Sequence, residues 1–197
     1  MDIKPVVLEG RYVRLVPLER EHADALWKAG SDADLWRYTA AKVYSLEQMH
    51  GYVETALREL ASGQSLPFTT TDAGSGEIIG STRFAAVAKE HKRVEIGYTF
   101  LSPAYQRTPV NTEAKFLMLQ HAFEVWGVNR VELKTGTQNS KSRAAIARIG
   151  GVEEGILRRH LINQDGFVRD TVFFGLIAEE WPETKARLEA KLSRPWP

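Results

Sequence analysis

Cysteine is absent from the 197 residues of the chain. Disulfides, thiolate metal sites and a cysteine nucleophile are therefore excluded, which is compatible with a reducing compartment. An excess of positive charge is also absent, because 26 Lys and Arg residues are balanced by 25 Asp and Glu residues and the net charge is +1. General binders of nucleic acid or membrane surfaces carry a basic excess, so we expect neither partner.

Long apolar runs are missing as well, and we expect no N-terminal signal peptide. The apolar run at residues 173–178 is far shorter than the roughly 20 residues that a membrane span needs. Asp2 and Lys4 interrupt any signal-peptide core at the start of the chain. We therefore expect a cytoplasmic protein. The five histidines are scattered without the spacing of metal ligands, so we expect no metal site.

What is present is an ordinary globular composition, with 43% hydrophobic, 10% aromatic and 26% charged residues. Neither an internal repeat nor a long linker divides the sequence, and its length suits one folding unit. We expect a single domain over residues 1–197. The oligomeric state is left open, with a homodimer among the alternatives.

The spacing of apolar residues predicts an alternation of strands and helices. Period-two alternation is typical of half-buried strands, and apolar residues at helical spacing are typical of amphipathic helices. The predicted strands are residues 11–16, 66–71, 77–87, 94–101, 131–135, 152–162 and 167–177. The predicted helices are residues 19–29, 46–60, 112–126, 140–149 and 179–192.

The connections between these elements indicate the type of sheet. Polar segments at residues 72–76 and 89–93 predict hairpin turns, as does the Asp-Gly pair at 165–166. The strand, helix, strand order over residues 94–135 implies a crossover with parallel pairing. The predicted fold class is α+β, with a mixed, mostly antiparallel central sheet of about seven strands flanked by helices.

The segment from Glu95 to Glu113 carries the strongest chemical signal. A strand ends at Ser102-Pro103, a short polar loop follows, and a helix begins at once. A helix N-terminus presents free N–H groups and the positive end of its dipole to an anion. Proline cannot donate a ladder hydrogen bond, so the strand tends to separate from its neighbour here. The unpaired backbone could then bind an extended ligand that contains amides.

This segment and three others resemble the GNAT acetyl-CoA-dependent N-acetyltransferases, and among them the RimJ/RimL-type ribosomal-protein N-terminal acetyltransferases. The similarity extends over most of the chain, from residue 8 to residue 181. Its four blocks are Glu-Ile-Gly-Tyr at 95–98, Asn-Thr-Glu-Ala-Lys at 111–115, Asn-Ser-Lys-Ser at 139–142, and Asp-Gly with Arg-Asp-Thr at 165–171. The resemblance implies a GNAT-like sheet that is splayed in the middle for the cofactor.

The resemblance also implies acetyl-CoA as co-substrate and indicates which residues bind it. The backbone of three strand residues would bind the pantetheine amides, the loop before the helix would hold the pyrophosphate, and an asparagine would bond the pantetheine arm. These cofactor-binding residues are Thr99, Phe100, Leu101, Gln106, Arg107, Thr108, Val110, Asn111, Thr112, Asn139 and Ser142.

The predicted pyrophosphate loop departs from the family pattern. The usual loop is Gln/Arg-x-x-Gly-x-Gly/Ala, whereas this chain has Gln-Arg-Thr-Pro-Val-Asn at residues 106–111. Pro109 removes one N–H donor, at a cost of about 1 kcal/mol. Proline nevertheless suits the first position of a helix. With Thr108 as cap, we expect the N–H groups of residues 110–112 to face outwards and Arg107 to add charge.

Two residues are candidates for proton transfer. Glu95 precedes the loop by the spacing at which histone-type members of the family carry a general base. The equally weighted alternative is a structural glutamate on a strand face, paired with a neighbouring arginine. Ser142 matches the serine that is proposed in the family to protonate the departing thiolate. Asn139 and Ser142 also suit the start of a helix, and capping is compatible with cofactor contact.

The acceptor is expected to be a primary amine. An α-amine with a pKa of about 7.7–8.0 is roughly one-tenth neutral at pH 7, whereas a lysine amine is neutral about once in 2,500. Because the sequence offers one candidate base, an acceptor that needs little help from a base is favoured. Such an acceptor is the α-amine of a protein, a peptide or an amino acid. The alternatives are a small-molecule amine, such as a polyamine or an aminoglycoside, and a non-catalytic acyl-CoA-binding module.

Two further groups of residues leave their roles open. The aromatic residues Trp27, Trp36, Tyr38 and Tyr52 could belong to the core or to a ligand cage. Residues 158–160, Arg-Arg-His, could lie on a sheet face or on the rim of a substrate site.

Overall fold

The computed structural model, which describes residues 1–194, is built on one mixed sheet of eight strands. The strands are β1 (Leu8–Glu9), β2 (Val13–Pro17), β3 (Leu66–Asp72), β4 (Ile78–Ala88), β5 (Arg93–Leu101), β6 (Arg130–Gly136), β7 (Val152–Ile162) and β8 (Val168–Ile177). They follow the order β1-β2-β3-β4-β5-β6-β8-β7 across the sheet. Among the described strands, only β5 and β6 pair in parallel. The predicted mixed, mostly antiparallel sheet is therefore confirmed.

The eighth strand, β1, is absent from the sequence prediction. It has two residues, Leu8 and Glu9, which pair with Leu15 and Arg14 of β2. Two residues are too few to show the alternation that marks a strand in a sequence, so only the pairing partner identifies it.

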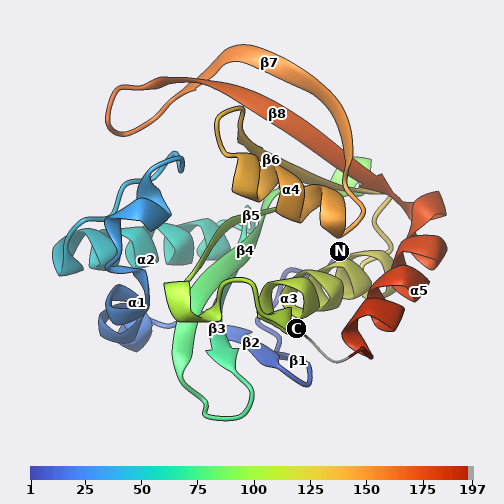
Figure 1. The fold of residues 1–197 in the computed structure, drawn as a ribbon, viewed down its shortest axis with the longest axis horizontal. Coiled ribbons are helices and arrows are strands. Elements are labelled where there is room, and N and C mark those ends of the chain that lie inside the picture. Colours follow the sequence, from blue (N-terminus) through green and yellow to red (C-terminus); the bar gives the residue numbers. More distant parts are fainter. Residues whose placement is uncertain (195–197) are drawn as a thin grey trace.

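Five α-helices flank the sheet (Figure 1). They are α1 (Ala23–Gly30), α2 (Leu46–Ala61), α3 (Pro109–Gln120), α4 (Ser140–Arg148) and α5 (Trp181–Leu192). Helices α1 and α2 pack together against β3 and β4, while α3 packs against β2 and α5. Two hydrophobic clusters result, a large one that includes α3 and a smaller one around α1 and α2. Within residues 1–194, no helix is long and apolar enough to cross a bilayer.

Helix boundaries differ from the prediction chiefly in α1, α3 and α5. Helix α5 starts at Trp181, after a 3₁₀ turn at Ala178–Glu180, where the sequence predicted a start at residue 179. Helix α3 begins at Pro109, three residues before the predicted start, because Thr108 caps it and proline occupies its first position. Its α-helical part ends at Gln120, and one turn of π-helix follows at His121–Val125. The predicted helix at residues 19–29 divides into a 3₁₀ turn, Arg20–His22, and α1.

The predicted hairpin turns are confirmed. The Gly76 N–H donates to the Asp72 carbonyl at 2.9 Å, which closes the turn between β3 and β4. Residues 89–91 form a 3₁₀ turn between β4 and β5. The Asn163 N–H donates to the Phe167 carbonyl at 2.9 Å and closes the hairpin of β7 and β8.

A buried carboxylate joins the start of the sheet to α3. Glu113 is 6% exposed and accepts N–H hydrogen bonds from Arg11, Tyr12 and Val13 at 2.9, 2.6 and 2.9 Å. Gly10 makes this approach possible, because a Cβ there would lie 2.4 Å from the carboxylate carbon. Three charge-assisted hydrogen bonds compensate the burial of the charge.

Strands β5 and β6 pair through three residues only. Arg93–Glu95 lie beside Arg130–Glu132, and the strands then diverge. Strand β5 continues to Leu101 beside β4, whereas β6 continues to Gly136 beside β8. The predicted splay in the middle of the sheet is therefore present. We call the point of divergence, at residues 95 and 132, the fork.

Candidate functional site

Beyond the fork, β5 offers a backbone edge that no strand covers among the residues that the structure describes. Residues 96–101 pair only with β4, apart from a bulge at Tyr98, whose φ is 52°. Phe100 faces the smaller cluster, with its ring 5.0 Å from that of Trp36. The Thr99 side chain hydrogen-bonds to Thr82. The side chains of Thr99 and Phe100 are thus engaged within the protein, and the backbone edge of this stretch toward β6 is open to an extended ligand.

The loop after β5 leads directly into the N-terminus of α3. The Gln106 side chain donates to the Leu101 carbonyl at 3.2 Å, and Arg107 is exposed. Thr108 accepts the Val110 N–H at 3.4 Å and donates to the Tyr105 carbonyl at 2.7 Å. The predicted cap and the proline that follows it are confirmed.

The first turn of α3 has fewer outward donors than the sequence suggested. Pro109 lacks an N–H, and Thr112 is the fourth residue after the cap, where a helical N–H bonds to the cap carbonyl. Thr112 is also fully buried. The Val110 N–H is already bound by the Thr108 hydroxyl at 3.4 Å, so the N–H of the partly exposed Asn111 is the donor that this turn leaves for a ligand.

Asn139 and Ser142 lie at the start of α4, directly after β6. Asn139 caps the helix, with its Oδ1 accepting the Ser142 N–H at 3.1 Å. The capping role that the sequence predicted is confirmed. It occupies the amide oxygen of Asn139 and leaves the amide N–H groups for other partners. Because residues 137–138 connect β6 to α4, both side chains lie on the β6 side of the fork.

Glu95 occupies the closed end of the fork. It is 5% exposed and pairs with Glu132 in the last step of the parallel ladder. Its carboxylate lies 2.7 Å from the Nζ atom of Lys134, two residues further along β6. Glu95 is therefore paired with a lysine. The alternative that Glu95 is a structural residue on a strand face had predicted an arginine as its partner. The sequence did not single out Lys134, because its proximity to Glu95 depends on the register of the two strands.

A buried lysine on α3 escaped the sequence analysis. Lys115 is 5% exposed, and its Nζ donates to the hydroxyls of Thr82 and Thr99 at 2.8 and 2.6 Å. Burial lowers the pKa of Lys115 to about 7. The position of Lys115 in the sequence could have indicated its burial. It lies three and four residues before the buried Met118 and Leu119 and so shares their helix face.

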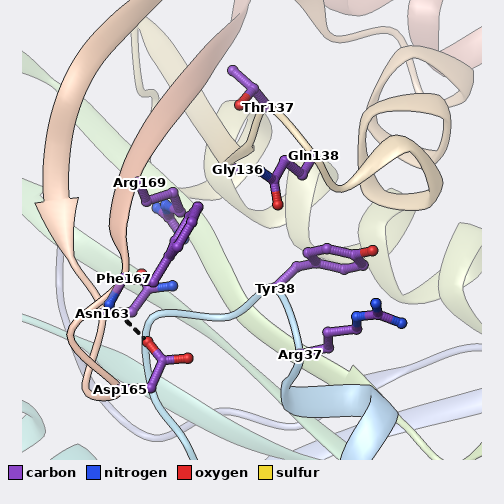
Figure 2. Close-up of a pocket in the computed structure, with 9 residues that line it drawn as sticks. All are labelled: Arg37, Tyr38, Gly136, Thr137, Gln138, Asn163, Asp165, Phe167 and Arg169. Atoms are coloured by element: carbon purple, nitrogen blue, oxygen red, sulfur yellow. Dashed lines mark hydrogen bonds between the residues drawn. The ribbon is translucent and has the colours of Figure 1, made fainter.

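A cavity of about 210 Å³ lies between the tip of the β7–β8 hairpin, the end of β6 and the loop before α2 (Figure 2). We call it the hairpin cavity. It is lined by Arg37, Tyr38, Gly136, Thr137, Gln138, Asn163, Asp165, Phe167 and Arg169. Figure 2 shows Phe167 and Arg169 on the hairpin side and Tyr38 on the opposite side. Three segments that are distant in the sequence therefore form it.

The aromatic residues and the arginines whose roles the sequence left open lie in different parts of the structure. Trp36 and Tyr52 are buried in the smaller cluster, and Trp27 packs against it. Tyr38 lines the hairpin cavity instead. Arg158 and Arg159 are exposed on β7 and do not line the cavity.

An ion pair closes one side of the hairpin cavity. The Nζ atom of Lys42, which is 8% exposed, lies 3.0 Å from the Asp165 carboxylate and also donates to the carbonyls of Trp36 and Arg37. The ion pair with Lys42 and the N–H of Phe167 together lower the pKa of Asp165. The tip of the hairpin is thus tied to the loop before α2.

Comparison with known proteins places this geometry in context. Residues 13–152 match a family described as the acetyltransferase (GNAT) domain. The uncharacterized N-acetyltransferase YoaA of Bacillus subtilis (strain 168) is 24% identical over 172 residues, which are 87% of this chain and 96% of YoaA. A GCN5-related N-acetyltransferase from Brucella melitensis is 31% identical with a TM-score of 0.89, over 96% of this chain and 86% of that one. Mycobacterium smegmatis RimJ in complex with CoA-disulfide is 25% identical with a TM-score of 0.80, over 98% of this chain and 95% of that one.

The low pKa of Lys115 predicts a pH dependence of stability. Between pH 7 and 10.5 the unfolded chain keeps a proton on this lysine that the folded protein has released, so stability rises with pH through that window. Replacement of Lys115 by methionine removes this contribution. We expect the free energy of unfolding of the wild type, relative to Lys115→Met, to rise by about 3 kcal/mol from pH 7 to pH 10.

Urea denaturation at several pH values measures this difference. Lys89→Met, which changes an exposed lysine in the turn after β4, serves as the control and should show a flat difference from the wild type. A flat difference for Lys115→Met as well would contradict the release of a proton from Lys115 on folding.

Proposed function

The chain belongs to the GNAT acetyltransferase family, and from this premise we propose that it moves an acetyl group from acetyl-CoA to an α-amine of a protein, a peptide or an amino acid. Its membership makes it an acetyl-CoA-dependent N-acetyltransferase, which sets aside the alternative of a non-catalytic module. The resemblance to RimJ/RimL-type members is supported by the match to Mycobacterium smegmatis RimJ. The class of amine is the part that we propose.

The pairing of the carboxylates at the fork and in the hairpin cavity is the observation that supports an α-amine. Glu95 is bound to Lys134 at 2.7 Å, Glu132 to two arginines at 2.8 and 3.0 Å, and Asp165 to Lys42 at 3.0 Å. Each of these carboxylates already has a cation within ion-pair distance, so none of the three is free to hold a second, protonated amine. Such a site suits an amine that is already partly neutral at pH 7, which an α-amine is and a lysine amine is not.

The hairpin cavity supports the same choice over a polyamine or an aminoglycoside. Polycationic acceptors require a surplus of acidic groups. The one carboxylate of the cavity lining, Asp165, is already paired with Lys42, and Arg37 and Arg169 line the same space. Like charges in a low-dielectric site repel, so a polycation would bind poorly there.

We propose that acetyl-CoA binds along the open edge of β5 and at the N-terminus of α3. The backbone of Thr99–Leu101 would hold the pantetheine amides, in the manner of strand addition. Residues 106–111 would hold the pyrophosphate, and the Asn139 amide N–H groups would bond the pantetheine arm. The described residues fit this assignment, because the edge is uncovered and α3 begins where β5 and its loop end. When bound, acetyl-CoA supplies the acetyl group as a thioester.

Arg107→Ala tests the pyrophosphate assignment. Because an exposed charge is screened by salt, the variant should weaken acetyl-CoA binding more at 20 mM than at 500 mM salt, as measured by calorimetry. Arg158→Ala removes an exposed arginine from β7 and should leave binding unchanged. Equal affinities of Arg107→Ala and the wild type at low salt would exclude a role for this arginine, and no binding to the wild type at millimolar acetyl-CoA would exclude the site.

We propose Glu95 and Ser142 as the proton-transferring residues. Glu95 lies at the closed end of the fork, where its carboxylate could take the amine proton directly or through a water molecule. Ser142 stands on the first turn of α4, on the β6 side of the fork, with its N–H bound to Asn139 and its hydroxyl left to donate. Lys134 holds the Glu95 carboxylate in place through an ion pair of 2.7 Å.

Glu95→Gln separates a base from a structural residue. The amide cannot take a proton, so turnover should fall by about 100-fold with little change in acetyl-CoA affinity. The defect should shrink as pH rises, because more acceptor amine is then neutral. Ser142→Ala should lower turnover by a smaller factor if water replaces the hydroxyl.

Lys134→Met is the matched control for the ion pair. If the role of Glu95 is only to form this ion pair, Lys134→Met and Glu95→Gln should lower the melting temperature by similar amounts. Both variants should then keep the rate per folded molecule of the wild type. Wild-type turnover of Glu95→Gln at pH 7 would refute the assignment as base.

A panel of acceptors tests the class of amine. At pH 7 we expect kcat/KM for peptides with a free α-amine to exceed that for N-terminally blocked lysine peptides by about 100-fold or more, because of the larger neutral fraction. Thiol release from acetyl-CoA reports the rate, and mass spectrometry locates the acetyl group. Preferential acetylation of lysine side chains, polyamines or aminoglycosides would contradict the proposal.

A further inference from the structure

Arg169, on β8 at the hairpin cavity, is a buried cation without a compensating anion. It is 8% exposed, and its Nε donates to the Thr171 hydroxyl at 3.2 Å. Within residues 1–194, no carboxylate lies within ion-pair distance of it. Burial lowers the pKa of Arg169, while the nearby Glu95 carboxylate acts in the opposite direction. A buried charge normally has a partner, so this guanidinium indicates that a negative group binds beside it.

The surroundings of Arg169 hold it toward the cavity. Its side chain crosses Gly136 at the end of β6, where a Cβ would lie 3.0 Å from the Arg169 Cδ. The one carboxylate of the cavity lining, Asp165, is occupied by Lys42 at 3.0 Å and by the Phe167 N–H at 3.1 Å. Asp165 therefore does not neutralise Arg169, and the guanidinium is left with N–H donors for a ligand.

A second orphaned group lines the same cavity. Asn163 is 4% exposed, and its buried Oδ1 atom has no hydrogen-bond partner. A buried polar atom without a partner is costly, and an amide oxygen accepts from an N–H or an O–H donor. The cavity thus presents a cation without an anion at ion-pair distance and an amide oxygen without a donor. One ligand that carries both a carboxylate and an amine would satisfy the two groups.

The cavity adjoins the fork through the end of β6. Gly136, Thr137 and Gln138 line it and lead directly to Asn139, which caps α4. Lys134, two residues before Gly136, binds Glu95. A volume of about 210 Å³ is small beside the roughly 300–1,000 Å³ of sites for drug-sized ligands, and it suits a single amino-acid residue.

We propose that the hairpin cavity binds an acceptor whose reactive α-amine is accompanied by a carboxylate, which pairs with Arg169. This inference rests on the proposed acetylation of α-amines and specifies which of them are substrates. The carboxylate has two sources, the α-carboxylate of a free amino acid or the side chain of an acidic first residue of a peptide. Both present a planar anion that a guanidinium binds with two parallel hydrogen bonds.

Matched acceptors with and without the negative charge, compared at equal concentrations of the neutral amine, test the inference. One pair is free glutamine and its α-amide, and the other is a peptide that begins with Glu and the same peptide with Gln. We expect the carboxylate member of at least one pair to have a kcat/KM about 10- to 100-fold higher, chiefly through a lower KM. The pair that shows the difference identifies the source of the carboxylate.

Variants of Arg169 assign the preference to this residue. Arg169→Met should abolish the difference within the pair, and Arg169→Lys should retain part of it, since lysine keeps the charge but not the paired hydrogen bonds. The melting temperature of Arg169→Met without acceptor should equal or exceed that of the wild type, because an uncompensated buried charge is removed. Arg158→Met, on the exposed strand β7 of the same hairpin, should keep the full preference.

The outcomes distinguish this inference from the proposed function. If the wild type acetylates α-amines equally with and without the carboxylate, the inference is wrong and the proposed function stands. If the wild type prefers the carboxylate but Arg169→Lys and Arg169→Met keep that preference, the assignment to Arg169 is wrong. If only lysine side chains or polyamines are acetylated, the proposed function itself is wrong.

Discussion

The short parallel pairing of β5 and β6 is the constraint on which the rest of the structure depends. Three residue pairs join these strands, and beyond Glu95 each strand follows a different neighbour. The divergence leaves one edge of β5 without a strand and places the start of α3 on one side and the start of α4 on the other (Figure 1). A fully paired sheet would fill that edge and leave no place for an extended amide ligand.

Buried charges divide into those that stabilise the fold and those that the fold leaves uncompensated. Glu113 accepts three backbone N–H groups, so its burial fixes the start of the sheet on α3. Lys115, two residues later, has only two hydroxyls as partners and loses its proton readily. Arg169 has one hydroxyl and lines a cavity. The less a buried charge is satisfied from within the protein, the more its surroundings suit a ligand or a proton transfer.

The sequence predicted those features of the site that depend on neighbouring residues. Thr108 caps α3 with proline after it, and Asn139 caps α4, because capping requires only a side chain of the right type next to a helix start. The ion pair of Glu95 with Lys134 was not predicted. These residues lie 39 positions apart, and they meet only because the parallel register sets Glu95 beside Glu132.

The sequence by itself therefore determined seven of the eight strands, the approximate positions of the helices, the hairpin turns, the two helix caps and the absence of thiol chemistry. Apolar periodicity and capping act over a few residues, so they can be recognised without the fold. Only the tertiary structure decided which side chains share the hairpin cavity, since residues 37–38, 136–138 and 163–169 come from three separate segments. Their meeting depends on strand register and on helix packing, which are long-range interactions that no local pattern encodes.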